Sequence, residues 1–470
     1  MRYFSIFATE LKDLRMELAQ DFIDEMKDTL PSGDVDELLK AIGAEPSVSI
    51  RLNPFSSIAP DELIARSGMS VSEPVPWSRL GLYLSERPLF TANPFFHAGC
   101  FYVQEASSMF LEQVVQSCVH SPVRVLDLCA APGGKSTHLR SILPEGSVLV
   151  ANEINRARAN VLAENLQKWG HPGVVVTNDT PDRIGASSLL FDVILVDAPC
   201  SGEGMFRKDP VAVSEWSMNN VNMCAERQRD ILRSVWPALK PGGFLIYSTC
   251  TYNRLEDEDN VRWISDELGA DVIPLDVPES WGIYGDTTGN NLPVCHFFQH
   301  RTRGEGFFIA LLRKNGTPSD LPERTNARPV SGAGDIYREW VVNPDALVFQ
   351  RHGDVVRALP ASEADFMLKV SSELRTIVNG VEIAVLKGRD WAPSHPLAMS
   401  RLLRCDAFPS VEVTEQQALS YLRSESISIP DAPKGYVLLM FSGVPLGFVK
   451  NVGNHANNLY PQQWRIRMGG

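Results

Sequence analysis

Hydrophobic and polar positions follow two alternating periods in the middle of this chain. Between residues 122 and 314, short apolar runs alternate with stretches in which apolar residues recur every three or four positions. Such runs are typical of buried strands and such stretches of amphipathic helices, so the alternation predicts a mostly parallel α/β sheet covered on both faces. Strands are predicted at 123–129, 147–154, 173–178, 191–197, 244–250 and 306–313, and helices at 134–143, 156–169, 222–239 and 256–268.

The flanking segments have other patterns. Two or three helices are predicted within residues 4–45 and another at 104–115, and Ser49–Asn53 reads as a strand that Pro54 ends. Strand-like and helical stretches follow at 384–388 and 414–424, and a small β-rich part contains the segments GYVLLMF and LGFVKNV. The predicted domains are an N-terminal helical and mixed extension at 1–120, an α/β domain at 121–314, a Pro- and Gly-rich linker at 315–334, an α+β module at 335–425 and a β-rich module at 430–470.

The segment Val125–Ser136, VLDLCAAPGGKS, combines a strand, a turn of small residues and a predicted helix start. This arrangement brings free backbone N–H groups close to a small charged ligand, so it indicates a nucleotide-like ligand. A phosphate-binding P-loop would need glycine at position 129, which is Cys129, and the three spaced glycines of a dinucleotide site are absent. The pattern therefore favours a ligand other than a di- or triphosphate.

Acidic residues follow three successive predicted strands. Glu153 can accept both ribose hydroxyls of a nucleoside, Asp179 suits the amine of an adenine, and Asp197 ends the fourth strand. A single acid at a strand end usually caps the next turn, but three beside a glycine turn favour a ligand site. Carboxylates attract the positive sulfonium and ammonium groups of S-adenosylmethionine, whereas they would repel the pyrophosphate of NAD.

Two cysteines also follow predicted strands, Cys200 in DAPCSGEGMFRKDP and Cys250 in YSTCTY. A free cysteine is usually a small buried hydrophobe, but the two strands should be neighbours, which would bring the thiols together. Two thiols, an acid and a methyl donor suit methylation at carbon 5 of cytosine. A thiolate that adds to C6 makes C5 nucleophilic, an acid near N3 stabilises the ring, and a base then removes the C5 proton.

Composition limits the remaining possibilities. The chain has 470 residues, room for about three domains. No apolar run reaches the ~18 residues that span a bilayer, and the acidic start is unlike a secretion signal, so we expect a cytoplasmic protein without a membrane partner. Its 8 cysteines form no CxxC pair, so neither disulfides nor a metal site is expected.

Charge is unevenly distributed along the chain. The net charge of −13 argues against nucleic acid when taken alone. Residues 1–50 hold 5 basic and 11 acidic side chains, a net charge of −6, whereas residues 432–470 hold Lys434, Lys450, Arg465 and Arg467 and no acid, a net charge of +4. Because local patches decide RNA contact, the basic C-terminal segment keeps an RNA partner open, although an uneven surface explains the charges equally well.

The motifs DLCAAPGGKS (127–136), DAPCSGEGMFRKDP (197–210), STCT (248–251) and GEGFFIALL (304–312) resemble the Sun/nucleolar-protein family of RNA cytosine-C5 methyltransferases. The upstream words RLN (51–53) and YVQEASS (102–108) are also similar, and the C-terminal segment resembles the bacterial members that methylate 16S ribosomal RNA. The resemblance implies a Rossmann-like methyltransferase fold, S-adenosyl-L-methionine as cofactor and a C-terminal PUA-like RNA-binding module. It covers residues 45–314 well, 430–462 moderately and 315–429 weakly.

The resemblance also implies roles for individual residues. Cys250 resembles the nucleophile that adds to C6, and Cys200 the second cysteine, which is needed for product release. Asp197 resembles the acid that contacts both the base and the methionine end of the cofactor. Glu153, a position where many relatives have Asp, resembles the ribose contact supported by Arg158, and Asp179 resembles the adenine contact. The loop around the methionine moiety corresponds to Cys129, Ala130, Ala131, Pro132, Gly133, Gly134 and Lys135.

Three functions remain open from the sequence. The first is methylation of cytosine in 16S ribosomal RNA, either naked or in the 30S subunit, by a monomeric enzyme. The second is the same chemistry on tRNA, which only the C-terminal resemblance disfavours. The third is a ribosome-assembly factor that binds RNA without catalysis, which the intact cysteines, acids and glycine turn argue against. Lys208 is either a substrate contact or an ordinary surface lysine.

Overall fold

The computed structural model describes residues 18–317 and 336–466 of the chain. Residues 4–17 of the predicted helical segment, most of the predicted linker, and Arg467 lie outside the described residues. Two units are distinguished by their internal packing. The first consists of Met1–Ser47, Ala198–Asp230 and Tyr247–Leu311, and the second of Val48–Asp197, Ile231–Ile246 and Leu312–Gly470.

The largest sheet has nine strands, with the order β10-β12-β9-β8-β5-β6-β7-β15 and β11 beside β12. β5 pairs in parallel with β6 and β8, and β6 pairs in parallel with β7, as the alternating pattern predicts. All six predicted strands between residues 122 and 314 are present. The strands are β5 (Arg124–Asp127), β6 (Val148–Asn152), β7 (Val174–Thr177), β8 (Phe191–Asp197), β9 (Leu239–Thr249), β10 (Ala270–Ile273), β11 (Cys295–Phe297), β12 (Phe307–Lys314) and β15 (Thr376–Asn379).

Continuous apolar runs form the parallel strands because helices cover both faces of such sheets. Leu126, Val150 and Val175 are fully buried in β5, β6 and β7. The helices α7 (Gly134–Ile142) and α8 (Arg156–Trp169) follow β5 and β6, within a residue of their predicted bounds. α8 begins where the Asn155 side chain accepts the N–H groups of Ala157 and Arg158, and it ends at Gly170, whose φ is 79°.

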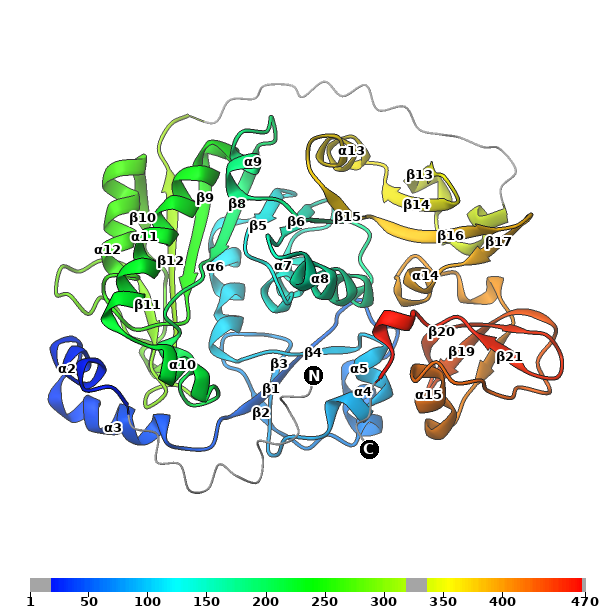
Figure 1. Cartoon of the computed structure of the whole chain (residues 1–470), viewed down its shortest axis with the longest axis horizontal. Coiled ribbons are helices and arrows are strands. Elements are labelled where there is room, and N and C mark those ends of the chain that lie inside the picture. Colours follow the sequence, from blue (N-terminus) through cyan, green and yellow to red (C-terminus); the bar gives the residue numbers. More distant parts are fainter. Residues whose placement is uncertain (1–17, 318–335, 467–470) are drawn as a thin grey trace. The chain divides into compact units, whose positions relative to one another are not determined.

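The last strand of this sheet comes from the C-terminal part of the chain. β15 pairs antiparallel with β7, with Thr376 opposite Thr177 and Asn379 opposite Val175. Figure 1 shows β15, drawn in gold, next to the teal strands of the sheet. Sequence patterning does not reveal this strand, because four residues, TIVN, carry no detectable alternation. The predicted α+β module thus supplies one strand to the sheet of the predicted α/β domain.

Three four-stranded sheets complete the second unit, with strand orders β2-β3-β1-β4, β13-β14-β16-β17 and β18-β19-β20-β21. The predicted strand at 49–53 is β1, the one at 384–388 falls largely in β16, and the C-terminal pair are β19 and β20. The predicted helix at 414–424 is α15 (Glu415–Leu422), which starts at a capping box formed by Thr414 and Gln417. The strands are β1 (Val48–Leu52), β2 (Val71–Pro74), β3 (Gly81–Leu84), β4 (Phe101–Val103), β13 (Leu347–His352), β14 (Val355–Pro360), β16 (Val381–Lys387), β17 (Asp390–Pro393), β18 (Ser410–Glu412), β19 (Gly435–Phe441), β20 (Val444–Asn451) and β21 (Ala456–Asn458).

Other helices pack around these sheets within the two units. α11 ends at Val235, earlier than predicted, because a short 3-10 turn containing Pro237 follows it. Among the described residues, no helix is both long and apolar enough to cross a membrane. The remaining α-helices are α2 (Gln20–Thr29), α3 (Ser32–Ile42), α4 (Pro60–Ser67), α5 (Pro94–His97), α6 (Leu111–Cys118), α9 (Pro181–Gly185), α10 (Pro210–Glu215), α11 (Met218–Val235), α12 (Glu258–Trp263), α13 (Ala364–Glu373) and α14 (His395–Met399).

Candidate active site

The sulfur atoms of Cys200 and Cys250 are 3.0 Å apart in the first unit. Cys200 follows β8 by three residues, and Cys250 comes directly after β9. The backbone holds the pair together, because the Cys250 N–H donates to the Cys200 Sγ at 3.3 Å and Ala198 N–H donates to Ser248 O at 2.8 Å. The prediction that these two strand ends bring the thiols together is confirmed.

The two thiols are not equivalent. The pKa of Cys200 lies well above its usual value, mainly because its thiol is hydrogen bonded to Cys250 and also because it is buried. Cys200 therefore keeps its proton, and a proton on Cys200 can be donated to the sulfur of Cys250.

The glycine turn lies in the second unit and opens α7, as predicted. Gly133 has a φ of 115°, which favours glycine, and a Cβ there would come within 3.3 Å of Leu162 Cδ1. Arg158 Nη2 donates to Ala131 O at 2.7 Å, and Asn165 Nδ2 donates to Pro132 O at 2.8 Å. Two side chains of α8 therefore fix the loop before the turn.

The start of the same loop is tied to β6. Ala130 N–H donates to Asn152 O at 2.9 Å, so the loop leaves β5 alongside its neighbouring strand. The pKa of the Cys129 thiol is raised mainly by burial and further by nearby carboxylates, so this thiol stays protonated. Cys129 and Ala130 therefore contribute small, uncharged side chains to the loop, and Gly134 begins the helix.

Four charged groups gather around this loop. Lys135 Nζ lies 2.9 Å from Asp197 Oδ2, and Asp127 Oδ2 accepts the Ser136 hydroxyl at 2.6 Å. The other oxygen of Asp127 is buried and has no hydrogen-bond partner within the described protein. Burial, followed in effect by the charges of Asp197 and Glu153, raises the pKa of Asp127 to about 7. Its place in the sequence motif alone predicts no separate role for Asp127.

Glu153 is the predicted ribose contact. Its carboxylate is buried at the end of β6, with Oε1 accepting the Asn155 N–H at 2.8 Å. Arg158 Nη1 lies 3.5 Å from Glu153 Oε2, so the arginine predicted to support this acid does contact it. One bond to each oxygen leaves further lone pairs of the carboxylate free to accept hydroxyl groups.

Asp179 lies at the end of β7, but its carboxylate is enclosed by protein. Its oxygens accept the backbone N–H of Arg375 at 2.5 Å and the Nε–H of Arg375 at 3.2 Å, and Arg183 Nε lies 3.4 Å away. No part of this side chain is exposed. The expected contact between Asp179 and adenine stays a prediction, and the structure adds Arg375 as a neighbour that the sequence did not indicate.

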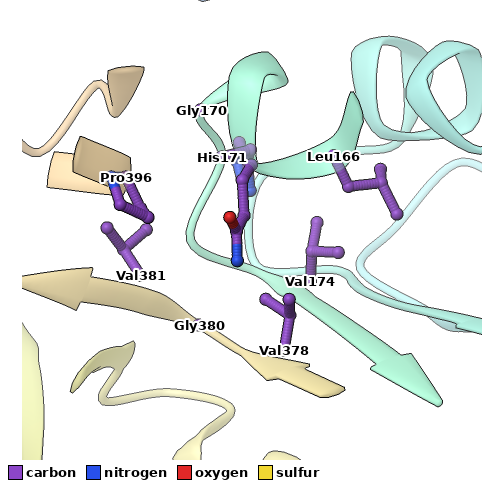
Figure 2. A pocket seen from close by; sticks show the side chains of 9 residues that line it. Leu166, Gly170, His171, Val174, Val378, Gly380, Val381 and Pro396 are labelled. Atoms are coloured by element: carbon purple, nitrogen blue, oxygen red, sulfur yellow. The ribbon is translucent and has the colours of Figure 1, made fainter. Parts of the chain in front are cut away.

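Lys208 is paired rather than free, since its Nζ lies 3.1 Å from Glu305 Oε1. Among residues 18–317 and 336–466, no group of three or more His, Cys, Asp or Glu side chains is arranged to hold a metal ion. A separate pocket lies between α8 and β7 on one side and β15 and α14 on the other (Figure 2). It is lined mostly by apolar side chains and contains none of the predicted site residues.

The residues of the glycine turn and its rim fit S-adenosylmethionine. An unpartnered buried oxygen on Asp127 and the carboxylate of Asp197 suit a cationic methionine end, because carboxylates attract positive groups strongly where water is excluded. Glu153 suits the ribose hydroxyls, and the turn has no side-chain bulk to keep a ligand away from the backbone.

Three family models match successive parts of this chain. A model of the 16S rRNA methyltransferases RsmB/F matches residues 119–313. The model of the N-terminal domain of 16S rRNA methyltransferase RsmF matches residues 18–106, and the model of the methyltransferase RsmF PUA domain matches residues 408–466. Residues 314–407, which include β15, lie between the range matched by the RsmB/F model and the range matched by the PUA-domain model.

Similar proteins extend over almost the whole chain. Ribosomal RNA small subunit methyltransferase F of Cronobacter sakazakii is 31% identical, over 95% of this chain and 96% of its own length. The protein of the same name from Escherichia coli is 31% identical, over 94% of this chain and 95% of its own. Among solved structures, a methyltransferase homolog protein from Pyrococcus horikoshii is 27% identical with a TM-score of 0.51, over 63% of this chain and 100% of its own.

Proposed function

The chain belongs to the ribosomal RNA small subunit methyltransferase F family, which uses S-adenosylmethionine to methylate RNA, and we propose that it methylates carbon 5 of a cytosine in 16S ribosomal RNA. The observation that carries the proposal is the distance of 3.0 Å between the sulfur atoms of Cys200 and Cys250. Methyl transfer to a nucleophilic nitrogen or oxygen needs no thiol pair, whereas C5 of cytosine must first be activated by addition of a nucleophile to C6.

The cofactor supplies a methyl group on a positively charged sulfur. Asp197, Asp127 and the loop from Cys129 to Lys135 are proposed to hold its methionine end, Glu153 with Arg158 its ribose, and Asp179 the adenine side. Asp197 and Cys200 are three residues apart in the chain, so their Cα atoms are within about 11 Å of each other. This covalent link supports a reaction in which the cofactor and the thiols act on one base.

Cys250 is proposed as the nucleophile and Cys200 as its partner. The Cys250 thiolate forms a bond to C6, and the electron pair displaced to C5 takes the methyl group. Asp197 is proposed to hydrogen bond the base near N3, which stabilises the charge on the ring. Once the Cys250 sulfur is bonded to carbon, it no longer forms the same hydrogen bond with the Cys200 thiol. The main cause of the raised pKa of Cys200 is then lost. Cys200 can then assist removal of the C5 proton, which expels Cys250 and restores the C5–C6 double bond.

RNA is proposed to reach this site with its target base turned out of the helix. Unstacking a base costs about a few kcal/mol and least where the base is unpaired. The basic side chains Lys434, Lys450 and Arg465 lie in or beside the segment matched by the PUA-domain model, and they are proposed to contact RNA phosphates. We propose a monomeric cytoplasmic enzyme whose substrate is naked 16S RNA or the 30S subunit.

Parallel methylation assays test the proposal. Naked 16S RNA, 30S subunits and tRNA are each incubated with the protein and labelled S-adenosylmethionine, and products are mapped by bisulfite sequencing. We expect 5-methylcytosine in 16S RNA, in one or both of its forms. Labelling of tRNA alone would show that tRNA, and not 16S RNA, is the substrate. Labelling of a cytosine that bisulfite still converts would show that the methyl group is not on C5. A strain with Cys250→Ala that assembles ribosomes normally while the deletion strain does not would favour a binding role instead.

A further inference from the structure

A buried polar cluster joins the two loops that carry the thiols in the first unit. Ser201 and Glu203 follow Cys200, whereas Thr251, Asn253 and Glu256 follow Cys250. We call these five residues the loop cluster. Ser201 is 6% exposed and the other four are 0% exposed. Burying so many polar groups is costly unless each is hydrogen bonded, so the bonds within the cluster constrain the two loops strongly.

The amide of Asn253 contacts both loops. Its Nδ2 lies 3.2 Å from Ser201 Oγ and 3.1 Å from Glu203 Oε1, on the loop of Cys200. It also lies 2.9 Å from Thr251 Oγ1 and 2.7 Å from Glu256 Oε1, on the loop of Cys250. Ser201 Oγ and Thr251 Oγ1 are themselves 2.9 Å apart. The residues directly after each cysteine are therefore held to one another through this amide.

Glu256 makes a second link between the loops. Its carboxylate accepts the backbone N–H of Ser201 at 3.1 Å, and that peptide unit starts at Cys200 itself. Gln228, on α11, donates through Nε2 to Glu256 at 2.6 Å and to Pro199 O, the carbonyl before Cys200, at 3.1 Å. The peptides on both sides of Cys200 are thus anchored, one directly by Glu256 and one through Gln228.

Each of these neighbours donates a hydrogen bond to Glu256. A glutamine at this position would direct its amide hydrogens at other donors, so the cluster requires a carboxylate although a glutamine has nearly the same shape. Burial raises the pKa of Glu256 to about 7, while its bonds from Ser201, Asn253 and Gln228 lower it. A buried acid is therefore kept under the Cys200 loop at a cost from burial that its hydrogen bonds offset only in part.

We propose that Glu256 and Asn253 are positioning residues that set the distance between the sulfur atoms of Cys200 and Cys250. The inference rests on the proposed function, because it treats these thiols as the reacting pair. Neither residue is assigned a contact with the base or the cofactor. They act through the backbone on either side of Cys200 and through the side chains that follow Cys250.

The chain provides a matched control two residues away. Glu258 is also 0% exposed, but its Oε1 accepts from Thr287 at 2.6 Å and lies 3.0 Å from His296 Nε2. None of these contacts is with the loop of Cys200 or with a residue of the loop cluster. Glu258→Gln therefore replaces a buried carboxylate in the same segment without touching the loop cluster, and any general effect of such a change appears in both variants.

The test measures how strongly Cys200 and Cys250 favour a disulfide with each other over mixed disulfides with glutathione, expressed as the effective concentration of one thiol relative to the other. This measurement does not require activity. Full-length protein is equilibrated with defined ratios of reduced and oxidised glutathione and quenched with acid. Mass spectrometry then gives the fraction with a Cys200–Cys250 disulfide. Mixed-disulfide formation between glutathione and the exposed Cys405 checks that the reagent acts equally in every variant.

We expect Glu256→Gln and Asn253→Ala to lower this effective concentration at least tenfold and Glu258→Gln to change it less than twofold. If Glu256→Gln does not fold, Thr251→Val removes one hydroxyl of the loop cluster with little change in shape and should lower the value two- to tenfold. Equal values for wild type and the cluster variants, or an equal loss in Glu258→Gln, would overturn the proposal. So would the absence of any Cys200–Cys250 disulfide in the wild-type protein.

A kinetic measurement separates this inference from the proposed function. In the Cys200→Ser background, Glu256→Gln should slow covalent attachment to RNA while leaving the dissociation constant of S-adenosylmethionine unchanged. If the cluster variants lower the effective concentration but no variant attaches to RNA, the proposed cytosine methylation is wrong, and the positioning role of Glu256 and Asn253 is still supported. A weakened cofactor affinity in Glu256→Gln alone would show that the residue acts on the whole fold, contrary to the inference.

Discussion

Arg375 donates its backbone N–H to the Asp179 carboxylate at 2.5 Å, which connects the turn after α13 to the end of β7. The contact extends further, because Asn178 N–H donates to Arg375 O at 2.9 Å and Ser188 N–H donates to Glu373 Oε2 at 2.7 Å. Residues 373–379 are outside the ranges matched by the family models, yet they enclose an acid at the rim of the parallel strands.

Asp179→Asn should therefore lower the free energy of unfolding. The asparagine amide would face the donors of Arg375 and Arg183, so at least one buried bond is lost, at a cost of about 1–3 kcal/mol. Denaturant unfolding of the full chain measures the change. Asp182→Asn, in the neighbouring helix α9, is the control and should stay within about 0.5 kcal/mol of wild type. Equal stability of the two variants would contradict the structural role of Asp179.

Binding of S-adenosylmethionine should depend on pH near neutrality. The pKa of Asp127 is about 7 without ligand, and a bound cation nearby would lower it. Affinity is then full above pH 7 and falls below it, by up to about tenfold per pH unit, because binding requires loss of the Asp127 proton. Calorimetric titrations between about pH 5.5 and 8.5 measure this slope.

Two comparisons assign the pH slope to Asp127. S-adenosylhomocysteine lacks the sulfonium charge, so its affinity should change less over the same range. Asp127→Asn should remove most of the slope, because the amide does not titrate in this range. An affinity for S-adenosylmethionine that is the same at pH 6 and pH 8 would show that Asp127 does not sense the cofactor.

Gly170→Ala should destabilise the second unit strongly. A Cβ at Gly170 would lie 2.2 Å from Met399 O, a backbone atom at the end of α14, and the φ of Gly170 is 79°. Overpacking against backbone typically costs about 1–3 kcal/mol, with strain at positive φ of about 1 kcal/mol in addition. Gly353→Ala, at a φ of 59° with nothing within 4 Å, isolates the strain. Similar melting temperatures of the two variants would contradict the close packing.

Substitution of the two thiols should give opposite results with RNA. Cys250→Ala should abolish turnover and form no adduct, since the nucleophile is missing. Cys200→Ser should accumulate protein bound covalently to RNA, because release of the methylated base is impaired. Denaturing gels of protein mixed with labelled 16S RNA and S-adenosylmethionine distinguish the two outcomes. A Cys200→Ser protein that turns over normally without an adduct would remove the role proposed for Cys200.

The parallel core could be predicted because its strands are continuous apolar runs, which carry a clear signal. The ends of these strands then predicted the cysteine pair, since residues that follow neighbouring parallel strands must meet at one edge. Cys200 and Cys250 are 50 positions apart in sequence, and the structure brings their sulfur atoms to 3.0 Å. The turn before α7 was also predicted, because Gly133 and Gly134 leave few alternatives to a tight turn.

Contacts that depend on tertiary packing could not be predicted in this way. Asn253 and Glu256 belong to a short polar stretch, TYNRLEDED, that reads as an exposed turn, although both are buried. Arg375 and β15 carry no local pattern that relates them to Asp179, some 196 positions earlier. Asp127 could have been proposed as a cofactor contact from its place at the end of the first strand, by the same argument that singled out the acids at 153, 179 and 197.

The antiparallel strand beside β7 also affects how this protein is made. Ribosomes release a chain from its N-terminus onward, and β15 follows both thiols by more than 120 residues. Until residue 379 has emerged, β7 has an unpaired edge and Asp179 lacks the N–H group of Arg375. The nine-stranded sheet is thus completed late in translation, so a nascent chain that already contains all residues matched by the RsmB/F model still lacks one strand of its largest sheet.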